Sequence, residues 1–181
     1  SVDAWTIDLS LRLSAQGKAT RPREAHALFG GSGFGPNHNQ AYEPLTIPIP
    51  ADSKRVLLAH AITGHGMALP ETANCAEFCT TTHTFFVGGE AHVVEYSEPG
   101  QALACMLAVP QGTVPNQYGT WWLGRNGWCP GREVPLQIVD VTADATPGED
   151  LTVAYTGLYK GAFFNADGAS IAMSSWLIVE K

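Results

Sequence analysis

Apolar and polar residues alternate along several short stretches of the chain. In AWTIDLSLRLS (4–14), every second residue from Trp5 to Leu13 is apolar, and the residues between them are polar or charged. A period of two is that of a β-strand with one buried face. The pattern therefore predicts a strand close to the beginning of the sequence.

Strand-like patterns recur along the rest of the chain. They occupy residues 55–62, 82–87, 91–96, 134–141, 151–159 and 169–180. The pair Gly88-Gly89 predicts a tight hairpin between two of these strands, and PGED (147–150) predicts a turn. No window of twelve or more residues keeps a helical period. Many short strands with turn signals predict an all-β fold, an antiparallel β-sandwich or jelly roll.

A glycine-rich segment, LFGGSGFGPNHNQ (28–40), stands apart from these strands. Four glycines among thirteen residues predict a loop. The segment lacks the flanking strand and helix of a phosphate-binding loop, so it does not indicate nucleotide binding.

Length and composition narrow the possible classes of protein. The chain has 181 residues, of which 45% are hydrophobic and 15% charged, as expected for one folded domain with a proper core. The formal net charge is −7 and no basic cluster occurs, which argues against nucleic acid as a partner. No apolar stretch approaches the roughly 20 residues that span a bilayer, so no membrane segment is expected.

The four cysteines indicate an oxidising compartment. Cys75, Cys79, Cys105 and Cys129 are an even number in a weakly charged β-type chain, which favours two disulfides. Three pairings are open, and four reduced core thiols are the alternative. A zinc site is disfavoured because no second tight cysteine pair follows the C-x3-C of residues 75–79.

The first cysteine pair encloses an acidic residue in NCAEFC (74–79). A Cys75–Cys79 bridge closes five residues, and the chain-entropy estimate gives it only about 2 kcal/mol of stability. Local rigidity is therefore the better reason for it, because a catalytic or binding carboxylate at Glu77 needs a fixed direction. The alternative is a surface turn with a solvated glutamate.

Aromatic residues are concentrated in YGTWWLGRNGWCPG (118–131). A Cys105–Cys129 bridge would hold this segment in a loop of about 25 residues and contribute about 3.5 kcal/mol. Tryptophan rings can stack on a sugar, and Arg125 can hold a carboxylate. The alternative is a tryptophan-rich core plug with an exposed arginine. The candidate sugar-facing rings are Trp121, Trp122 and Trp128.

Several of these motifs occur together in one order: AITGHGMA (61–68), CAEFC (75–79), THT (82–84), PNQYGTW (115–121) and RNGWCPG (125–131). In this arrangement the chain resembles the C-terminal half of the peptide-N-glycosidase F family, secreted bacterial amidases that remove N-linked glycans. The resemblance runs from about residue 2 to the end. It implies an antiparallel eight-stranded jelly-roll β-sandwich, the second of two side-by-side jelly rolls, with no metal or cofactor.

The resemblance also implies roles for individual residues. Glu77 matches an active-site acid, Arg125 matches the arginine that holds the principal catalytic aspartate, and the cysteines pair as Cys75–Cys79 and Cys105–Cys129. On this basis Glu77→Gln is expected to lower hydrolysis and leave thermal stability nearly unchanged. Phe78 stands where the family has tryptophan, and His65 lies in a stretch that differs in order from the family's. The predicted substrate-binding residues are Trp121, Trp122, Trp128, Phe78 and His65.

In this family the principal aspartate belongs to a preceding jelly roll, and no residue here matches it. Residues 1–27 are then expected to be a linking strand from that domain, and residues 28–181 the C-terminal jelly roll. The implied activity is hydrolysis of the amide bond between asparagine and N-acetylglucosamine in a glycopeptide, together with that domain. The chain alone is expected to be inactive, and the location to be secreted or periplasmic.

Two alternatives compete with the amidase interpretation. Peptidylglycine monooxygenases share the paired jelly rolls and bind copper through histidine and methionine, and His83 with Met173 falls in similar places. The alternative for these two residues is a hydrogen-bonded histidine and a core methionine. The second is a non-catalytic glycan-binding or scaffolding jelly roll, since one fold serves many functions.

Overall fold

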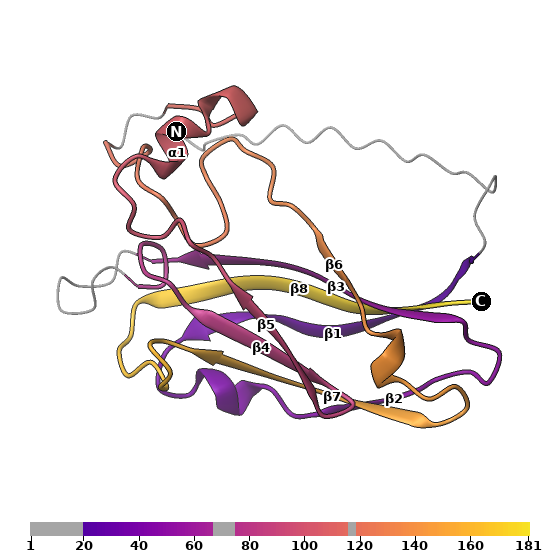
Figure 1. Cartoon of the computed structure of the whole chain (residues 1–181). Coiled ribbons are helices and arrows are strands. Elements are labelled where there is room, and N and C mark those ends of the chain that lie inside the picture. The colour runs from indigo at the N-terminus through magenta and orange to yellow at the C-terminus, as the bar shows by residue number, and fades with distance from the viewer. Residues whose placement is uncertain (1–19, 67–74, 116–118) are drawn as a thin grey trace, which may run out of the picture.

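The chain folds as a β-sandwich of two four-stranded antiparallel sheets. The computed structural model describes residues 20–66, 75–115 and 119–181, so the strand predicted at 4–14 lies outside the described residues. The first sheet has the order β1 (Pro22–Phe34), β8 (Ala169–Glu180), β3 (Arg55–His65) and β6 (Gln137–Asp140). The second has the order β2 (Leu45–Pro48), β7 (Asp150–Leu158), β4 (Thr82–Val87) and β5 (Glu90–Glu95). Figure 1 shows the two layers.

The strand pairing is nested. β1 pairs with β8, β2 with β7, β3 with β6 and β4 with β5, as in one long hairpin rolled up on itself. This connectivity joins the eight strands into the expected all-β antiparallel sandwich. It leaves β6 and β5 as edge strands of the two sheets, with the hairpin of β4 and β5 turning at Gly88 and Gly89, both at positive φ as predicted.

The core lies between the sheets and follows the period of two. Every second residue of β8 from Ile171 to Val179 is buried, and β7 buries Leu151, Val153 and Tyr155. β3 is buried along most of its length because it is a central strand. Five of the six expected strands that lie outside 4–14 match observed ones closely, and the sixth, 134–141, is shortened to β6.

The prediction of a loop at 28–40 is wrong for its first half. Residues up to Phe34 belong to β1 and pair with β8, with irregularities in the register around Gly30. Phe29 and Phe34 enter the core, and this burial outweighs the low strand preference of glycine. At Gly31 the backbone of β8 approaches so closely that a Cβ would meet the α-carbon of Ala172 at 2.8 Å.

The boundary expected at residue 28 also needs correction. It falls inside β1, and residues from Pro22 onward pair with β8 as part of this sandwich. β2 was not predicted either, because its four residues, with proline at 48, are too few for a periodic signal.

Among the described residues, helical structure is confined to short turns. It consists of α1 (Ala104–Leu107), η1 (His38–Ala41), η3 (Val109–Gln111) and η4 (Thr142–Asp144). The long connection from β5 to β6 carries α1 and lies beyond one end of the sandwich, next to the end of β3 (Figure 1). In the described part of the chain, no helix has the length and apolar character needed to cross a membrane.

A chain of polar side chains runs through the core of the second sheet. The Tyr155 hydroxyl lies 2.6 Å from Nδ1 of His83, and Nε2 of His83 lies 2.8 Å from the Thr81 hydroxyl. The side-chain amide of Asn126 donates to the same hydroxyl. His38 approaches Tyr155 from the other side at 3.5 Å. Because buried polar groups need partners, these residues fix one another's orientation.

The buried His83 makes stability depend on pH. Burial, together with His38 and His60, lowers the pKa of His83 to about 3, against an ordinary value of 6.5. Below pH 6.5 the unfolded chain therefore binds a proton that the folded chain does not, and stability falls as the pH drops toward 3. This one group accounts for about 2 kcal/mol between pH 7 and pH 5.

Urea denaturation at pH 7 and pH 5 measures this dependence. The free energy of unfolding differs between the two pH values, and we expect His83→Gln to reduce that difference by about 2 kcal/mol. Tyr155→Phe is the matched control, because it removes a hydrogen bond to the same ring but leaves a titratable histidine, and it should lower stability at both pH values. An unchanged pH dependence in His83→Gln would contradict the prediction.

Candidate functional site

The loop that carries Glu77 is fastened to the end of β3. The Cys75–Cys79 bridge closes it, with the two α-carbons 5.0 Å apart. The backbone amide of Asn126 donates to the Glu77 carbonyl at 2.9 Å, and the amide of Gly64 on β3 donates to the Asn126 carbonyl at 2.8 Å. Backbone hydrogen bonds thus hold the loop, the segment after Arg125 and β3 in one arrangement.

Glu77 and Arg125 form an ion pair in this arrangement. Nε of Arg125 donates to Oε1 of Glu77 at 2.7 Å, and the side chains are only 4% and 13% exposed. The other oxygen, Oε2, lies 3.3 Å from the backbone amide of Gly66. The carboxylate therefore has one oxygen held by a full charge and one with a long contact to the backbone, which leaves it free to accept from a ligand.

The remaining guanidinium nitrogens of Arg125 are held by its own segment. Nη1 donates to the carbonyls of Trp121 and Leu123, each at 3.3 Å, and Nη2 donates to the Thr120 hydroxyl at 3.2 Å. The curled backbone before Arg125 thus orients the whole side chain. Arg125 was expected to hold an aspartate from another domain, and in this chain its carboxylate partner is Glu77.

Aromatic rings surround the ion pair. The guanidinium carbon of Arg125 lies 5.1 Å from the ring centre of Phe78 and 4.9 Å from that of Trp128, within the range of cation–π attraction. The indole of Trp128 donates to the Gly64 carbonyl at 2.9 Å. His65 packs on Trp128 with ring centres 5.0 Å apart, and Nε2 of His65 lies 2.7 Å from the Thr63 hydroxyl. Burial lowers the pKa of His65, and the charge of Glu77 acts against that shift.

Five of the predicted site residues therefore lie together: Glu77, Arg125, Trp128, Phe78 and His65. Trp121 contributes its carbonyl, and its ring packs edge-on against Trp122 at 6.1 Å. Trp122 is 36% exposed, and its carbonyl accepts hydrogen bonds from the first residues of α1. No contact of the Trp122 ring with the ion pair is seen among the described residues.

The second disulfide supports the arginine side of the site. Cys105 at the start of α1 is bridged to Cys129, with α-carbons 5.5 Å apart. The bridge closes a loop within the connection between β5 and β6, and Cys129 directly follows Trp128. Both bridges therefore stand next to the ion pair, one on each partner's segment.

A cavity of about 180 Å³ opens beside Arg125 and Trp128. Its walls carry charges of both signs, from Glu98, Glu133 and Arg132. The mixture of aromatic, cationic and anionic groups can accept and donate hydrogen bonds to a polar neutral molecule.

The copper alternative does not fit the residues present. Both ring nitrogens of His83 already have hydrogen-bonding partners, so a metal would have to displace Tyr155 or Thr81. Met173 packs in the core cluster. Over residues 20–66, 75–115 and 119–181, no group of three or more His, Cys, Asp or Glu side chains could hold a metal ion.

Sequence reasoning did not identify the residues that support the Glu77–Arg125 ion pair. Asn126 is fully buried and links the Glu77 loop to Thr81 and Gly64. Asparagine is frequent in turns, so Asn126 carries no local signal of this role. Thr120 was missed because its contact with Arg125 depends on how the segment curls, which no local pattern predicts.

Gly64 is the position where this packing leaves no room for a side chain. A Cβ there would meet the Ala76 carbonyl oxygen and lie 2.7 Å from the Asn126 amide nitrogen. We expect Gly64→Ala to lower the free energy of unfolding by about 1 to 3 kcal/mol, measured by urea denaturation. Gly33→Ala on β1 is the matched control, since nothing lies within 4 Å of its added Cβ. Equal effects of the two substitutions would refute the close packing.

Comparison with known proteins connects this site to a family. The sequence profile of the family described as "Peptide-N-glycosidase F, C terminal" matches residues 36–178, which is most of the chain. The chain belongs to this family. A curated relative, peptide-N(4)-(N-acetyl-beta-D-glucosaminyl)asparagine amidase F of Elizabethkingia miricola, is 30% identical over 139 residues, or 71% of this chain and 37% of the relative.

Solved structures agree with this assignment. The chain resembles a crystal structure of peptide-N(4)-(N-acetyl-β-D-glucosaminyl)asparagine amidase with a TM-score of 0.67 and 25% identity, over 87% of this chain and 51% of that one. A structure of peptide-N-glycosidase F from Flavobacterium meningosepticum, described as a glycosylasparaginase, gives 0.62 and 24%, over 92% and 53%. PNGF-II, at 0.61 and 16%, shares the fold over 91% of this chain and 31% of its own. The chain spans about half or less of these relatives.

Proposed function

We propose that this chain is the C-terminal domain of an amidase that hydrolyses the bond between asparagine and N-acetylglucosamine in N-linked glycopeptides. The observation that carries the proposal is the shielded Glu77–Arg125 ion pair between Phe78 and Trp128. The relatives of the family supply the reaction, since the curated one is named as an amidase of this kind.

The chemistry of amide hydrolysis fits Glu77 as one of two carboxylates. Amide hydrolysis needs an activated water, a proton for the leaving nitrogen and donors for the developing oxyanion. Oε2 of Glu77 can accept a hydrogen bond from a water or from a sugar hydroxyl, while Arg125 holds the carboxylate in a fixed position. Trp128 offers an apolar face for the first sugar. No cofactor has a part in this scheme.

A second acid comes, in this proposal, from a preceding domain. The chain covers only 51% and 53% of two solved relatives, so each of them has a further part of similar length. A glycopeptide bound between the two domains would meet Glu77 from one side and the second acid from the other. We further propose a secreted or periplasmic location, which the two disulfides support.

A deglycosylation assay tests the proposal. An N-glycopeptide is incubated with this chain alone and with this chain joined to its preceding domain, and mass spectrometry follows the conversion of asparagine to aspartate. We expect conversion only with the joined protein. Conversion with neither protein would overturn the amidase function.

A non-catalytic glycan-binding domain is the second candidate. It is favoured by the side chain of Arg125, which already donates to four acceptors of its own chain and so has little capacity left for an external acid. Glycan binding without conversion of asparagine in the same assay would select this function.

A further inference from the structure

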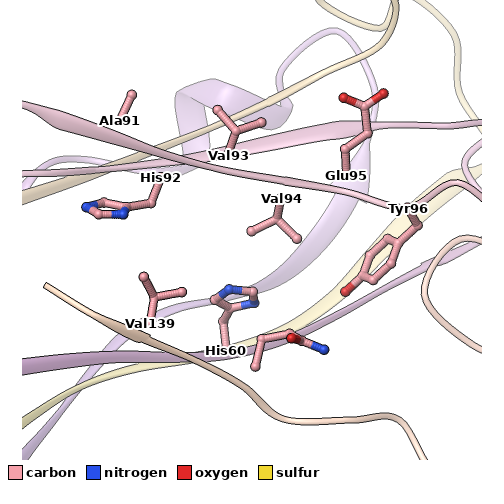
Figure 2. Close-up of a pocket in the computed structure, with 9 residues that line it drawn as sticks. His60, Ala91, His92, Val93, Val94, Glu95, Tyr96 and Val139 are labelled. Atoms are coloured by element: carbon pink, nitrogen blue, oxygen red, sulfur yellow. The ribbon is translucent and has the colours of Figure 1, made fainter.

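A groove runs along the open side of the sandwich, between the edge strands β5 and β6. Its volume is about 530 Å³, which lies within the range of small-molecule sites of about 300 to 1,000 Å³. Figure 2 shows His92 and Val94 of β5 pointing toward His60 of β3 and Val139 of β6, whereas Ala91, Val93 and Glu95 point away from them. The groove therefore lies between the inner faces of the two sheets.

His60 lies at the floor of this groove with an unused polar atom. Its side chain is 2% exposed, and its Nδ1 has no hydrogen-bond partner in the described part of the protein. The ring stacks on Phe85 with centres 5.3 Å apart, which fixes its plane. Leaving a buried polar atom without a partner is unfavourable, so Nδ1 is a site for a ligand's hydrogen-bonding group. Burial also lowers the pKa of His60, which favours the neutral ring.

The walls of the groove restrict the kind of ligand. Val94 and Val139 are apolar, Gln137 supplies an exposed amide, and His92 is held by Asp144 at 2.8 Å. None of these groups presents a free positive charge to an anion. A neutral molecule with hydroxyl groups on its edge and C–H groups on its face matches such walls, and a sugar ring has this chemistry.

The groove adjoins the candidate active site. Tyr96 and Gln137 line both this groove and the smaller cavity beside Arg125 and Trp128. The Tyr96 hydroxyl donates to the Ile62 carbonyl at 3.0 Å, so the ring between the two spaces is fixed. A linear chain of sugars that begins at Trp128 can thus continue past Tyr96 toward His60.

We propose that the groove between β5 and β6 is an accessory subsite for a neutral sugar unit of the glycan, anchored by His60 and Gln137. The proposal rests on the proposed function, because it places the asparagine-linked end of the same glycan at Arg125 and Trp128. It adds a second binding site for the glycan, which the hydrolysis itself does not require.

The test is NMR observation of the histidine rings of this chain during titration with a neutral N-glycan oligosaccharide released from protein. We expect the His60 signals to shift saturably at millimolar oligosaccharide. Val139→Phe fills the groove and should abolish the shift. Ile138→Phe is the matched control, because Ile138 is 55% exposed and the period of two places it on the opposite face of β6. Gln137→Ala should raise the apparent Kd by about five-fold, the effect of one lost hydrogen bond.

The outcomes separate the subsite from the amidase function. A His60 shift that Val139→Phe removes and Ile138→Phe retains supports the subsite, whatever the hydrolysis assay gives. An unchanged His60 signal, or equal behaviour of the two phenylalanine variants, overturns it. The conversion of asparagine in the joined protein depends on Glu77 and not on His60, so the proposed function stands or fails in its own assay.

Discussion

Replacing Arg125 with alanine is expected to lower the free energy of unfolding by about 3 to 5 kcal/mol, because it leaves the Glu77 carboxylate buried without its cation. The side chain is 4% exposed, and its Nε is 2.7 Å from Glu77. The substitution also removes the donors that hold the carbonyls of Trp121 and Leu123. Urea denaturation followed by far-UV circular dichroism measures the loss through the shift in midpoint.

Two further variants make this prediction specific. Arg132→Ala removes an exposed arginine that lines the same cavity, and it should change stability by less than about 0.5 kcal/mol. Arg125→Lys keeps the positive charge but lacks the planar guanidinium group that donates in several directions. Its loss of stability should therefore fall between those of the two alanine variants. If Arg125→Ala costs no more than Arg132→Ala, the ion pair is not part of the folded architecture.

The strands were predictable where burial follows a period of two without interruption. β7 and β8 have this pattern, and their positions agree with the expected ones to within a residue. β1 was not predictable, because its glycines signal a loop in any local window. Only the long-range pairing with β8 and the burial of Phe29 and Phe34 show it to be a strand.

The residues of the candidate site were predictable, but the contacts between them were not. Glu77 and Arg125 were recognised from a bridged loop and from family motifs, and they are 48 residues apart in sequence. Nothing local says that they meet, and the expected partner of Arg125 was an external aspartate. The supporting contact of Asn126 with Thr81 spans 45 residues. Such contacts depend on how β3, β4 and the long connection pack, which no sequence period encodes.

Glu77→Gln in the joined two-domain protein is expected to reduce deglycosylation by about 10²- to 10⁴-fold, the contribution typical of one positioned acid or base. The amide keeps the shape of the side chain and can still accept from Nε of Arg125, but it cannot take or deliver a proton. Initial rates on an N-glycopeptide, read as aspartate formed, measure the loss.

The ion pair changes what this variant should do to stability. The sequence predicted nearly unchanged stability without knowledge of the ion pair, whereas Glu77 is 13% exposed and bonded to a buried cation. A loss of about 1.5 to 3 kcal/mol is therefore expected, the range for hydrogen bonds to charged groups. Rates must accordingly be compared at a temperature where circular dichroism shows both proteins to be folded.

Glu98→Gln is the matched control for the catalytic role. Glu98 lines the cavity beside Arg125, and no ion pair of its carboxylate is seen among the described residues. It should keep most of the activity and stability. If the folded Glu77→Gln protein were as active as Glu98→Gln, Glu77 would be only the structural counter-charge of Arg125. The reaction would then have to be carried by acids of the other domain, with this domain supplying the Trp128 face and the groove at His60.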